Sequence, residues 1–230
     1  MKWELIVLIV FDILFLIFGC LDSYGCYKEN RKMHLIFKCF PLAILTILSI
    51  IIYPSNYFVW LGFLFCFFGD LFILIGTKKL FYVGASSFFI GHCLFSVFYT
   101  LLIYNINKQI PMYVIIGIPS ILLLFAIVFV IVLYKKVKLQ SIAMGLYYAI
   151  LFVNLFLAIS YAITSHSLYF IITIVGYCFF VFSDVLIGLR QYKITLKHGE
   201  FAIISSYFVA QLLISIGILL DWILFKNLGV

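Results

Sequence analysis

Two aspartates inside otherwise apolar stretches offer the clearest chemistry in the chain. Asp70 lies six residues before Gly76, and Asp184 lies six residues before Arg190. At a rise of about 1.5 Å per residue, both carboxyl groups would lie about 9 Å inside the same end of helical segments. Burial favours the neutral form of a carboxyl group, and a second negative charge nearby strengthens this effect. An ionisable residue at such a depth is a candidate functional residue, so we expect both aspartates to belong to a site within the membrane.

Four more polar residues lie within or at the edge of apolar stretches, at depths compatible with the two aspartates. They are Lys38, His92, Tyr207 and Gln211. Three of them enter from the same end as the aspartates, and His92 lies about 18 Å deep. We expect these groups to line one cavity that opens at that end, with His92 at its floor. The sequence contains no phosphate-binding glycine loop, serine-hydrolase elbow or zinc-protease motif, and no cofactor is expected.

Each of these residues also has a structural interpretation. Asp70 and Asp184 would link helices if Ser or Tyr hydroxyls bonded to them. Lys38 would extend toward lipid headgroups, and His92 would be a satisfied interior histidine. Asp12, a third acid inside an apolar stretch, is interpreted as structural because nothing matches it in depth or motif. The metal-ligand set that these stretches offer is Asp70, Asp184 and His92, and no metal is predicted there.

Transmembrane helices must position these residues. Of the 230 residues, 67% are hydrophobic and 10% are charged, whereas a soluble domain carries about 25% charged residues. The hydrophobic residues form runs of about 20, which is the length that spans a bilayer as a helix. The sequence therefore predicts an all-α membrane protein and a single integral membrane domain over residues 1–230. Its eight predicted transmembrane helices lie at about 5–21, 35–53, 57–75, 80–103, 112–133, 139–163, 168–189 and 201–224.

The basic residues predict how these spans are oriented. Twelve of the 15 lysines and arginines lie in or beside the loops after spans one, three, five and seven. By the positive-inside rule these loops face the cytoplasm, and both termini are extracytoplasmic. The net charge of +7 then reflects topology and contact with anionic headgroups rather than nucleic-acid binding. The first run lacks a clear cleavage site and is predicted to be a retained helix. The six cysteines form no C-x-x-C pair and are predicted to be reduced.

Two pairs of spans resemble each other. Spans three and seven share the pattern Phe-x-Asp-x-x-Ile around Asp70 and Asp184, and spans four and eight align His92 with Gln211. Such similarity arises either by chance in Phe-, Leu- and Ile-rich segments or by a 4+4 parallel internal repeat. A duplication would relate the two halves by a pseudo-two-fold axis along the membrane normal.

The candidate residues fall in four short motifs. In chain order these are Lys38-Cys39-Phe40-Pro41-Leu42; Gly69-Asp70-Leu71 followed by Phe81, Gly84, Phe88, Gly91 and His92; Ser183-Asp184-Val185-Leu186; and Tyr207-x-x-Ala210-Gln211-Leu212-Leu213. Together they resemble the lysoplasmalogenase family of YhhN-like membrane proteins, in order and spacing over about residues 35–215. Eight spans also match that family. Phe95 is a departure, because many members carry Tyr there after the histidine, and no effect on the chemistry is expected.

The resemblance implies hydrolysis of the vinyl ether bond of lysoplasmalogens, which gives a fatty aldehyde and a glycerophospho-ethanolamine or -choline. Enol ethers are cleaved by protonation at carbon, addition of water to the oxocarbenium ion and collapse of the hemiacetal. The reaction calls for one protonated and one ionised carboxyl group, and we expect Asp70 and Asp184 to supply them. Paired carboxyl groups in glycosidases offer an analogy. The sequence leaves open which of the two is the acid.

The remaining candidates receive supporting roles in this reaction. His92 and Gln211 would orient the water molecule or an aspartate. Tyr207 would donate a hydrogen bond within the site. Lys38 would hold the lipid phosphate near the headgroup region.

Other functions stay open from the sequence. A transporter or lipid scramblase also contains buried acids, a scaffold would use them only for packing, and a different hydrolase would cleave another ether or ester lipid. The expected partners are a lysophospholipid substrate and membrane lipids, without nucleic acid, and the oligomeric state is not predicted. The K-C-x-P motif resembles eukaryotic members, which implies the endoplasmic reticulum membrane, whereas a bacterial member would lie in the cytoplasmic membrane.

Overall fold

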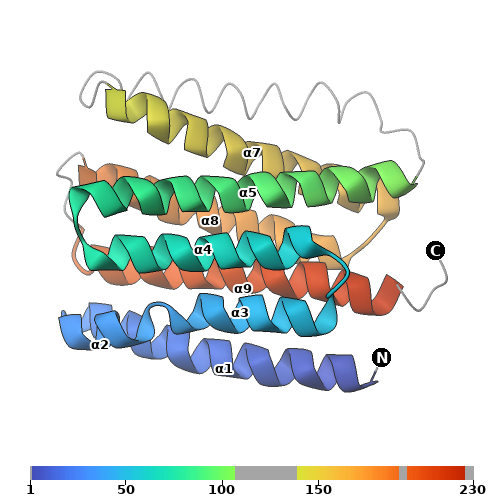
Figure 1. The fold of residues 1–230 in the computed structure, drawn as a ribbon, viewed down its shortest axis with the longest axis horizontal. Coiled ribbons are helices and arrows are strands. Elements are labelled where there is room, and N and C mark those ends of the chain that lie inside the picture. Colours follow the sequence, from blue (N-terminus) through green and yellow to red (C-terminus); the bar gives the residue numbers. More distant parts are fainter. Residues whose placement is uncertain (1, 107–138, 192–195, 226–230) are drawn as a thin grey trace.

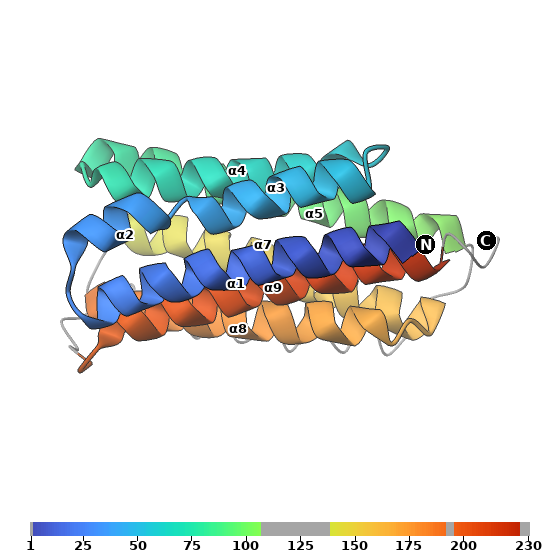
Figure 2. The same cartoon turned by 90° about the horizontal axis from the view of Figure 1, so that it is seen from below.

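The computed structural model describes residues 2–106, 139–191 and 196–225, and these ranges are almost entirely helical. The helices are α1 (Lys2–Tyr27), α2 (Arg31–Phe37), α3 (Phe40–Ile52), α4 (Tyr57–Ile75), α5 (Lys78–Ile106), α7 (Leu139–Ser165), α8 (Tyr169–Gln191) and α9 (Gly199–Phe225). They lie along one common axis as a bundle (Figure 1). Seen at 90° to this view, α3, α4 and α5 lie on one side of the bundle and α1, α8 and α9 on the other (Figure 2).

The protein is a multi-pass membrane protein. The described residues contain seven spans that are long and apolar enough to cross a membrane, and large apolar side chains such as Ile6, Ile9 and Ile13 are about half exposed on the outer face of α1. Seven of the eight predicted spans coincide with these segments, and the third matches α4 at both ends. The predicted span 112–133 lies outside the described residues. Most other helices extend beyond their predicted limits by one to six residues.

One end of the bundle is basic. The α1–α2 turn, the α4–α5 turn and the start of α9 lie together there, whereas the start of α1 and the end of α9 lie at the opposite end (Figure 1). Described basic residues near these turns are Lys28, Arg31, Lys79, Arg190 and Lys197. This basic end is the one for which we predict a cytoplasmic location.

The predicted span 35–53 is interrupted, because α2 ends at Phe37 and α3 begins at Phe40. Pro41 occupies the first turn of α3. It has no backbone N–H and therefore provides no donor for the carbonyl group four residues earlier, at Phe37. Lys38 and Cys39 form the joint between the two helices. The break is thus a direct consequence of Pro41, and it places Lys38 beside the interior of the bundle.

Helices α4 and α5 form a closely packed antiparallel hairpin. A Cβ atom added to Gly84 of α5 would lie 2.9 Å from the carbonyl oxygen of Gly69 on α4, and one added to Gly91 would lie 2.8 Å from the carbonyl oxygen of Gly62. These distances are shorter than a Cβ atom tolerates, so only glycine allows the two backbones to approach this closely. Gly84 and Gly91 are seven residues apart and therefore lie on one face of α5.

The arrangement of the helices bears on the predicted repeat. Helix α4 contacts α3 and α5, and α8 contacts α7 and α9. Likewise, α5 contacts α7, and α9 contacts α3. If each helix is replaced by the one four spans later, counted in a circle, each contact turns into its counterpart: α3–α4 into α7–α8, α4–α5 into α8–α9, and α5–α7 into α9–α3. These matched contacts agree with a 4+4 duplication, which itself stays a prediction.

Candidate active site

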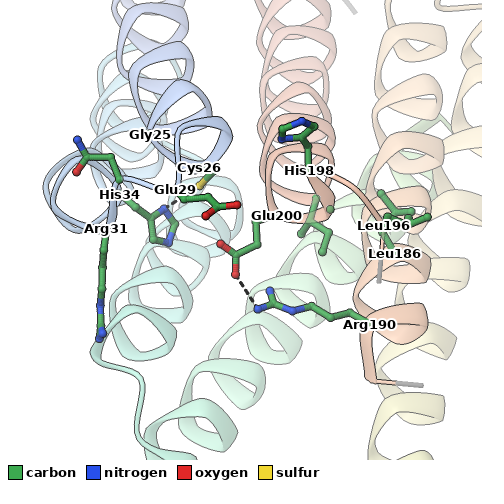
Figure 3. Close-up of a pocket in the computed structure, with 13 residues that line it drawn as sticks. Gly25, Cys26, Glu29, Arg31, His34, Leu186, Arg190, Leu196, His198 and Glu200 are labelled. Atoms are coloured by element: carbon green, nitrogen blue, oxygen red, sulfur yellow. Dashed lines mark hydrogen bonds and ion pairs between the residues drawn. The ribbon is translucent and has the colours of Figure 1, made fainter. Parts of the chain in front are cut away.

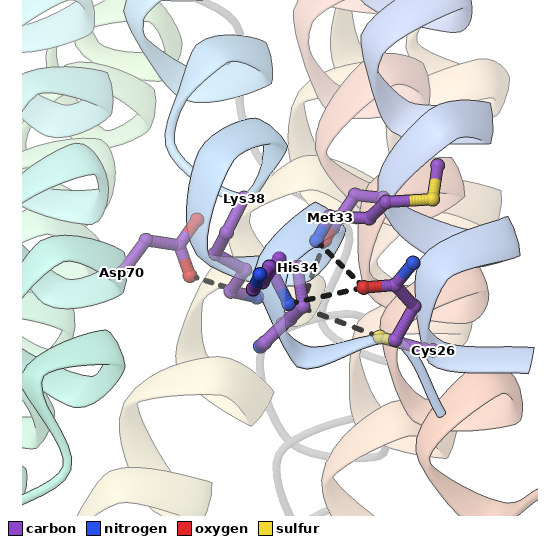
Figure 4. Close-up of polar contacts among 8 residues, drawn as sticks. Cys26, Met33, His34, Lys38 and Asp70 are labelled. Atoms are coloured by element: carbon purple, nitrogen blue, oxygen red, sulfur yellow. Dashed lines mark hydrogen bonds and ion pairs between the residues drawn. The ribbon is translucent and has the colours of Figure 1, made fainter. Parts of the chain in front are cut away.

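Asp70 lies on α4 with 2% of its surface exposed, and two polar groups hold its carboxylate. The Lys38 Nζ atom lies 3.1 Å from Asp70 Oδ1, as Figure 4 shows. The Tyr207 hydroxyl group donates a hydrogen bond of 3.0 Å to Asp70 Oδ2. These three residues come from the α2–α3 joint, α4 and α9, so the carboxylate connects segments that are far apart in the sequence.

Lys38 points into the bundle rather than toward the lipid headgroups. Only 6% of its surface is exposed, and its ammonium group lies 4.7 Å from the centre of the Tyr207 ring and 5.3 Å from that of Phe208. A buried ammonium group next to a carboxylate and two aromatic faces is well compensated for its loss of hydration. The structure therefore gives Lys38 the Asp70 carboxylate as a partner, in place of the lipid phosphate or headgroup region expected from its depth alone.

Asp184 has different surroundings. It is on α8 and is 8% exposed, and the Tyr148 hydroxyl group donates to its backbone oxygen at 2.7 Å. The Tyr147 side chain lies against its carboxyl group. Its Oδ2 atom is buried and has no hydrogen-bond partner, and the ion pairs of the described residues include none with Asp184.

Tyr147 connects the two carboxyl groups. It lies within electrostatic reach of both Asp184 and Asp70, and Tyr207 lies within reach of Tyr147. The contacts of the described residues include no hydrogen bond between the two aspartates themselves. Asp70, Tyr207, Tyr147 and Asp184 thus form one cluster, in which the two acids share Tyr147 as a neighbour and make no direct contact with each other among the described residues.

His92 lies on α5, fully buried, and Asn154 of α7 orients it. The Asn154 Nδ2 atom donates to the His92 backbone oxygen at 2.9 Å and lies 3.4 Å from the ring Nδ1 atom. The Ser96 hydroxyl group in turn donates to Asn154 Oδ1 at 2.7 Å. In a neutral ring, Nδ1 then accepts and Nε2 carries the proton. Nε2 has no partner among the described residues, so it is a free donor inside the bundle.

The histidine ring lies beside the cluster of acids. Its centre is 6.0 Å from that of Tyr147 and 4.8 Å from that of Phe180, and Phe180 contacts the Tyr207 ring at 5.6 Å. Gln211 of α9 is fully buried with its amide in contact with the Cys66 thiol, and neither amide atom makes a well-formed hydrogen bond among the described residues. Buried polar atoms are almost always bonded, so the atoms of His92 and Asp184 without a partner among the described residues are candidates for bonding water or a ligand.

A pocket of about 550 Å³ opens at the basic end of the bundle, between α1–α2 and α8–α9 (Figure 3). Its lining includes His34, Leu186 and Ile203. These residues lie within about one helical turn of Lys38, Asp184 and Tyr207, respectively. None of the six candidate residues is part of the lining of this pocket, so it is not the cavity that the sequence predicted. The acids lie deeper than the pocket.

Tyr147 and Asn154 belong to this cluster but were not among the residues singled out from the sequence. Asn154 did carry a signal, because an amide in the middle of the predicted span 139–163 needs a hydrogen-bond partner. Tyr147 is one of 16 tyrosines and nothing distinguishes it by sequence. Asp70, Asp184 and His92, the metal-ligand set that the apolar stretches offer, are not among the groups of described residues whose ligand atoms lie close enough to share an ion.

Comparison with known proteins identifies one family that the chain matches. The model of the YhhN family matches residues 33–218. Neither the curated proteins nor the solved structures contain a match. The matched range includes all six candidate residues predicted from the sequence, together with Tyr147 and Asn154.

Proposed function

The chain belongs to the YhhN family, and from this membership we propose that it is a lysoplasmalogenase-type hydrolase that cleaves the vinyl ether bond of alkenyl-lysophospholipids. The products are a fatty aldehyde and a glycerophospho-ethanolamine or -choline. The observation that carries the proposal is the contrast between the two buried carboxyl groups. Asp70 has an ammonium group 3.1 Å away, whereas Asp184 has an unpartnered oxygen and no cation among its described neighbours.

This contrast assigns the two roles. An adjacent ammonium group stabilises the ionised carboxylate of Asp70, and the Tyr207 hydrogen bond does the same. Burial without a counter-ion favours the neutral carboxylic acid at Asp184, because an isolated charge in an apolar interior is costly. Two carboxyl groups whose surroundings differ in this way are suited to act as an acid and a base at the same pH.

The reaction begins with proton transfer from the Asp184 carboxylic acid to the alkenyl carbon that is not bonded to oxygen. The carbon bonded to oxygen becomes an oxocarbenium centre, which the Asp70 carboxylate stabilises. Water then adds to that centre and gives its proton to Asp70. His92 Nε2 and the Gln211 amide orient this water molecule through the polar atoms that the protein itself leaves free.

Collapse of the hemiacetal restores both groups. Asp184, now a carboxylate, takes the proton of the hemiacetal hydroxyl group as the aldehyde forms. Asp70, now protonated, gives its proton to the departing glycerol oxygen. The sum of the steps is the vinyl ether plus water giving alcohol plus aldehyde, and no redox partner is needed. In this scheme Lys38 keeps Asp70 ionised, and the lipid headgroup lies in the pocket at the basic end.

The test is aldehyde release from alkenyl-lysophospholipids with ethanolamine or choline headgroups by the purified protein in detergent. The Asp184→Asn variant should lose several orders of magnitude in rate, since Asn has no proton of suitable acidity. Asp221→Asn is the matched control, because Asp221 is equally buried on α9 but binds Tyr161 and Ser167 at the opposite end of the bundle. Its rate per folded molecule should be unchanged.

Two results would overturn the proposal. One is a folded wild-type protein that releases no aldehyde from either headgroup class. The other is an Asp184→Asn variant with wild-type activity. As a substrate control, the saturated alkyl ether analogue should be inert, because it has no double bond to protonate. Cleavage of an ester lysophospholipid in place of the vinyl ether would indicate a different lipid hydrolase.

A further inference from the structure

A second cluster of reactive side chains lies at the turn between α1 and α2, apart from the acids of the proposed site. Asp22 and Cys26 are four residues apart and therefore lie on the same face of α1. His34 of α2 faces them across the turn. One oxygen of Asp22, the Cys26 sulfur and one His34 ring nitrogen all lie within 4.8 Å of one another. Figure 4 shows the Cys26 sulfur directed at the His34 ring.

The fold holds this turn tightly. Glu29 adopts a left-handed backbone conformation with φ of 55°, and the Asn30 side chain caps α2 by accepting from two backbone N–H groups. A Cβ atom on Gly25 would lie 2.8 Å from the Cβ atom of Met33, so α1 and α2 approach each other as closely as glycine permits. The position of His34 relative to α1 is therefore fixed by the backbone.

The cluster is buried and incompletely bonded. Asp22 is 0% exposed and Cys26 is 7% exposed, while the His34 side chain is 29% exposed. His34 Nδ1 lies 2.8 Å from Asp22 Oδ1 and 3.3 Å from Cys26 Sγ. The second carboxylate oxygen of Asp22 is buried and has no hydrogen-bond partner in the part of the chain that the structure describes. A fully buried carboxylate with an unsatisfied oxygen requires a further positive or donating group.

We propose that Asp22, Cys26 and His34 form a zinc-binding site. Thiolate, imidazole and carboxylate are the three ligand types that Zn²⁺ uses, whereas Mg²⁺ and Ca²⁺ prefer oxygen alone. With zinc bonds of 2.0 to 2.3 Å in tetrahedral geometry, the nitrogen would lie about 3.4 Å from the oxygen and about 3.6 Å from the sulfur. The observed separations of 2.8 and 3.3 Å need to open by less than about 1 Å, which small side-chain rotations supply.

The fourth coordination position opens into the pocket at the basic end. Cys26 and His34 both line that pocket, and so does Glu200 of α9 (Figure 3). Glu200 lies within electrostatic reach of Cys26 and pairs with Arg190 at 2.7 Å. The ion would thus bind three ligands from α1 and α2 and keep one position for water or a pocket ligand. Asp22 and Cys26 precede the range 33–218 that matches the family model, whereas His34 lies within it.

The experiment measures metal binding directly. The purified protein in detergent is freed of metal with a chelator and titrated with Zn²⁺, and a parallel sample is titrated with Co²⁺, whose thiolate charge-transfer absorption reports a sulfur ligand. We expect one equivalent of metal and a cobalt–thiolate band. Cys26→Ser should abolish the band and weaken zinc binding by more than about tenfold. Cys20→Ser, an exposed cysteine on the same helix, should bind like the wild type.

Two outcomes would overturn the proposal. They are the absence of stoichiometric metal binding in the folded wild type, and a cobalt–thiolate band that persists in Cys26→Ser. His34→Gln provides a second test that does not depend on how Cys26→Ser folds, because His34 is partly exposed. It should weaken zinc binding to a similar extent while α2 keeps its Asn30 cap. None of these measurements depends on lipid hydrolysis.

Discussion

The buried ion pair between Lys38 and Asp70 makes a quantitative prediction. Their side chains are 8% and 3% exposed, so removal of either partner leaves the other charge in the interior without compensation. Such a loss costs about 3–5 kcal/mol of unfolding free energy. We therefore expect both Asp70→Asn and Lys38→Met to destabilise the protein by about this amount.

The double variant should recover most of the lost stability. With both charges gone, Met fills the space of the Lys38 stem and Asn keeps the shape of Asp70, and such replacements of a buried pair are often neutral. The double-mutant cycle should give a coupling energy of at least about 2 kcal/mol, well above the error of such cycles. The exposed pair Arg190 and Glu200, at 61% and 56% exposure, is the control and should couple by less than about 1 kcal/mol.

Reversible unfolding in mixed micelles, followed by tryptophan fluorescence and circular dichroism, supplies the four free energies. Additive effects of the two single substitutions would refute the ion pair as the structure has it. Activity separates stability from catalysis, because the stable double variant lacks the Asp70 carboxylate and should release no aldehyde. A double variant that is both stable and active would refute the role assigned to Asp70.

Three further predictions concern positions outside this pair. Gly84→Ala should lower the unfolding free energy by about 1–3 kcal/mol, because its Cβ atom meets backbone, whereas Gly19→Ala, with ordinary contacts at 3.5 Å, should be neutral in the same unfolding assay. Asp221→Asn should cost about 1–3 kcal/mol through weakened hydrogen bonds, and a thermal midpoint equal to that of the wild type would contradict this. Asn154→Ala should reduce kcat by about 10- to 100-fold with little change in KM, because the His92 ring loses the side chain that fixes its orientation. A change in KM alone would contradict a positioning role for Asn154.

The spans could be predicted well from the sequence because the thickness of the bilayer fixes their length. An apolar run must be about 20 residues long to cross it, and α4 begins and ends where its run does. The break between α2 and α3 cannot be recognised from hydropathy, because the missing backbone N–H group of Pro41 does not change how apolar the segment is. Pro41 lies in the first turn of the new helix, α3.

The candidate site was harder to predict from one sequence than the spans, because its contacts depend on the directions of the side chains. Depth follows from counting residues, so the position of Lys38 near Asp70 was predictable. The direction in which a side chain points depends on the rotation of its helix against its neighbours, which runs of Phe, Leu and Ile leave open. This is why Lys38 was assigned to a lipid phosphate, and why Asn154, whose role depends on packing of α7 against α5, was not singled out.

The ion pair also has a consequence for how the chain enters the membrane. A lone Lys or Asp at a helix centre costs about 2.5–3.5 kcal/mol on insertion scales. Lys38 and Asp70 are carried by segments that are neighbours in sequence, joined by a turn of only a few residues after α3. The two charges therefore meet as soon as this hairpin has been inserted, long before Tyr207 has been synthesised. Insertion thus needs no later helix to neutralise them, and the Asp70 carboxylate has its counter-ion from the first half of the chain onward.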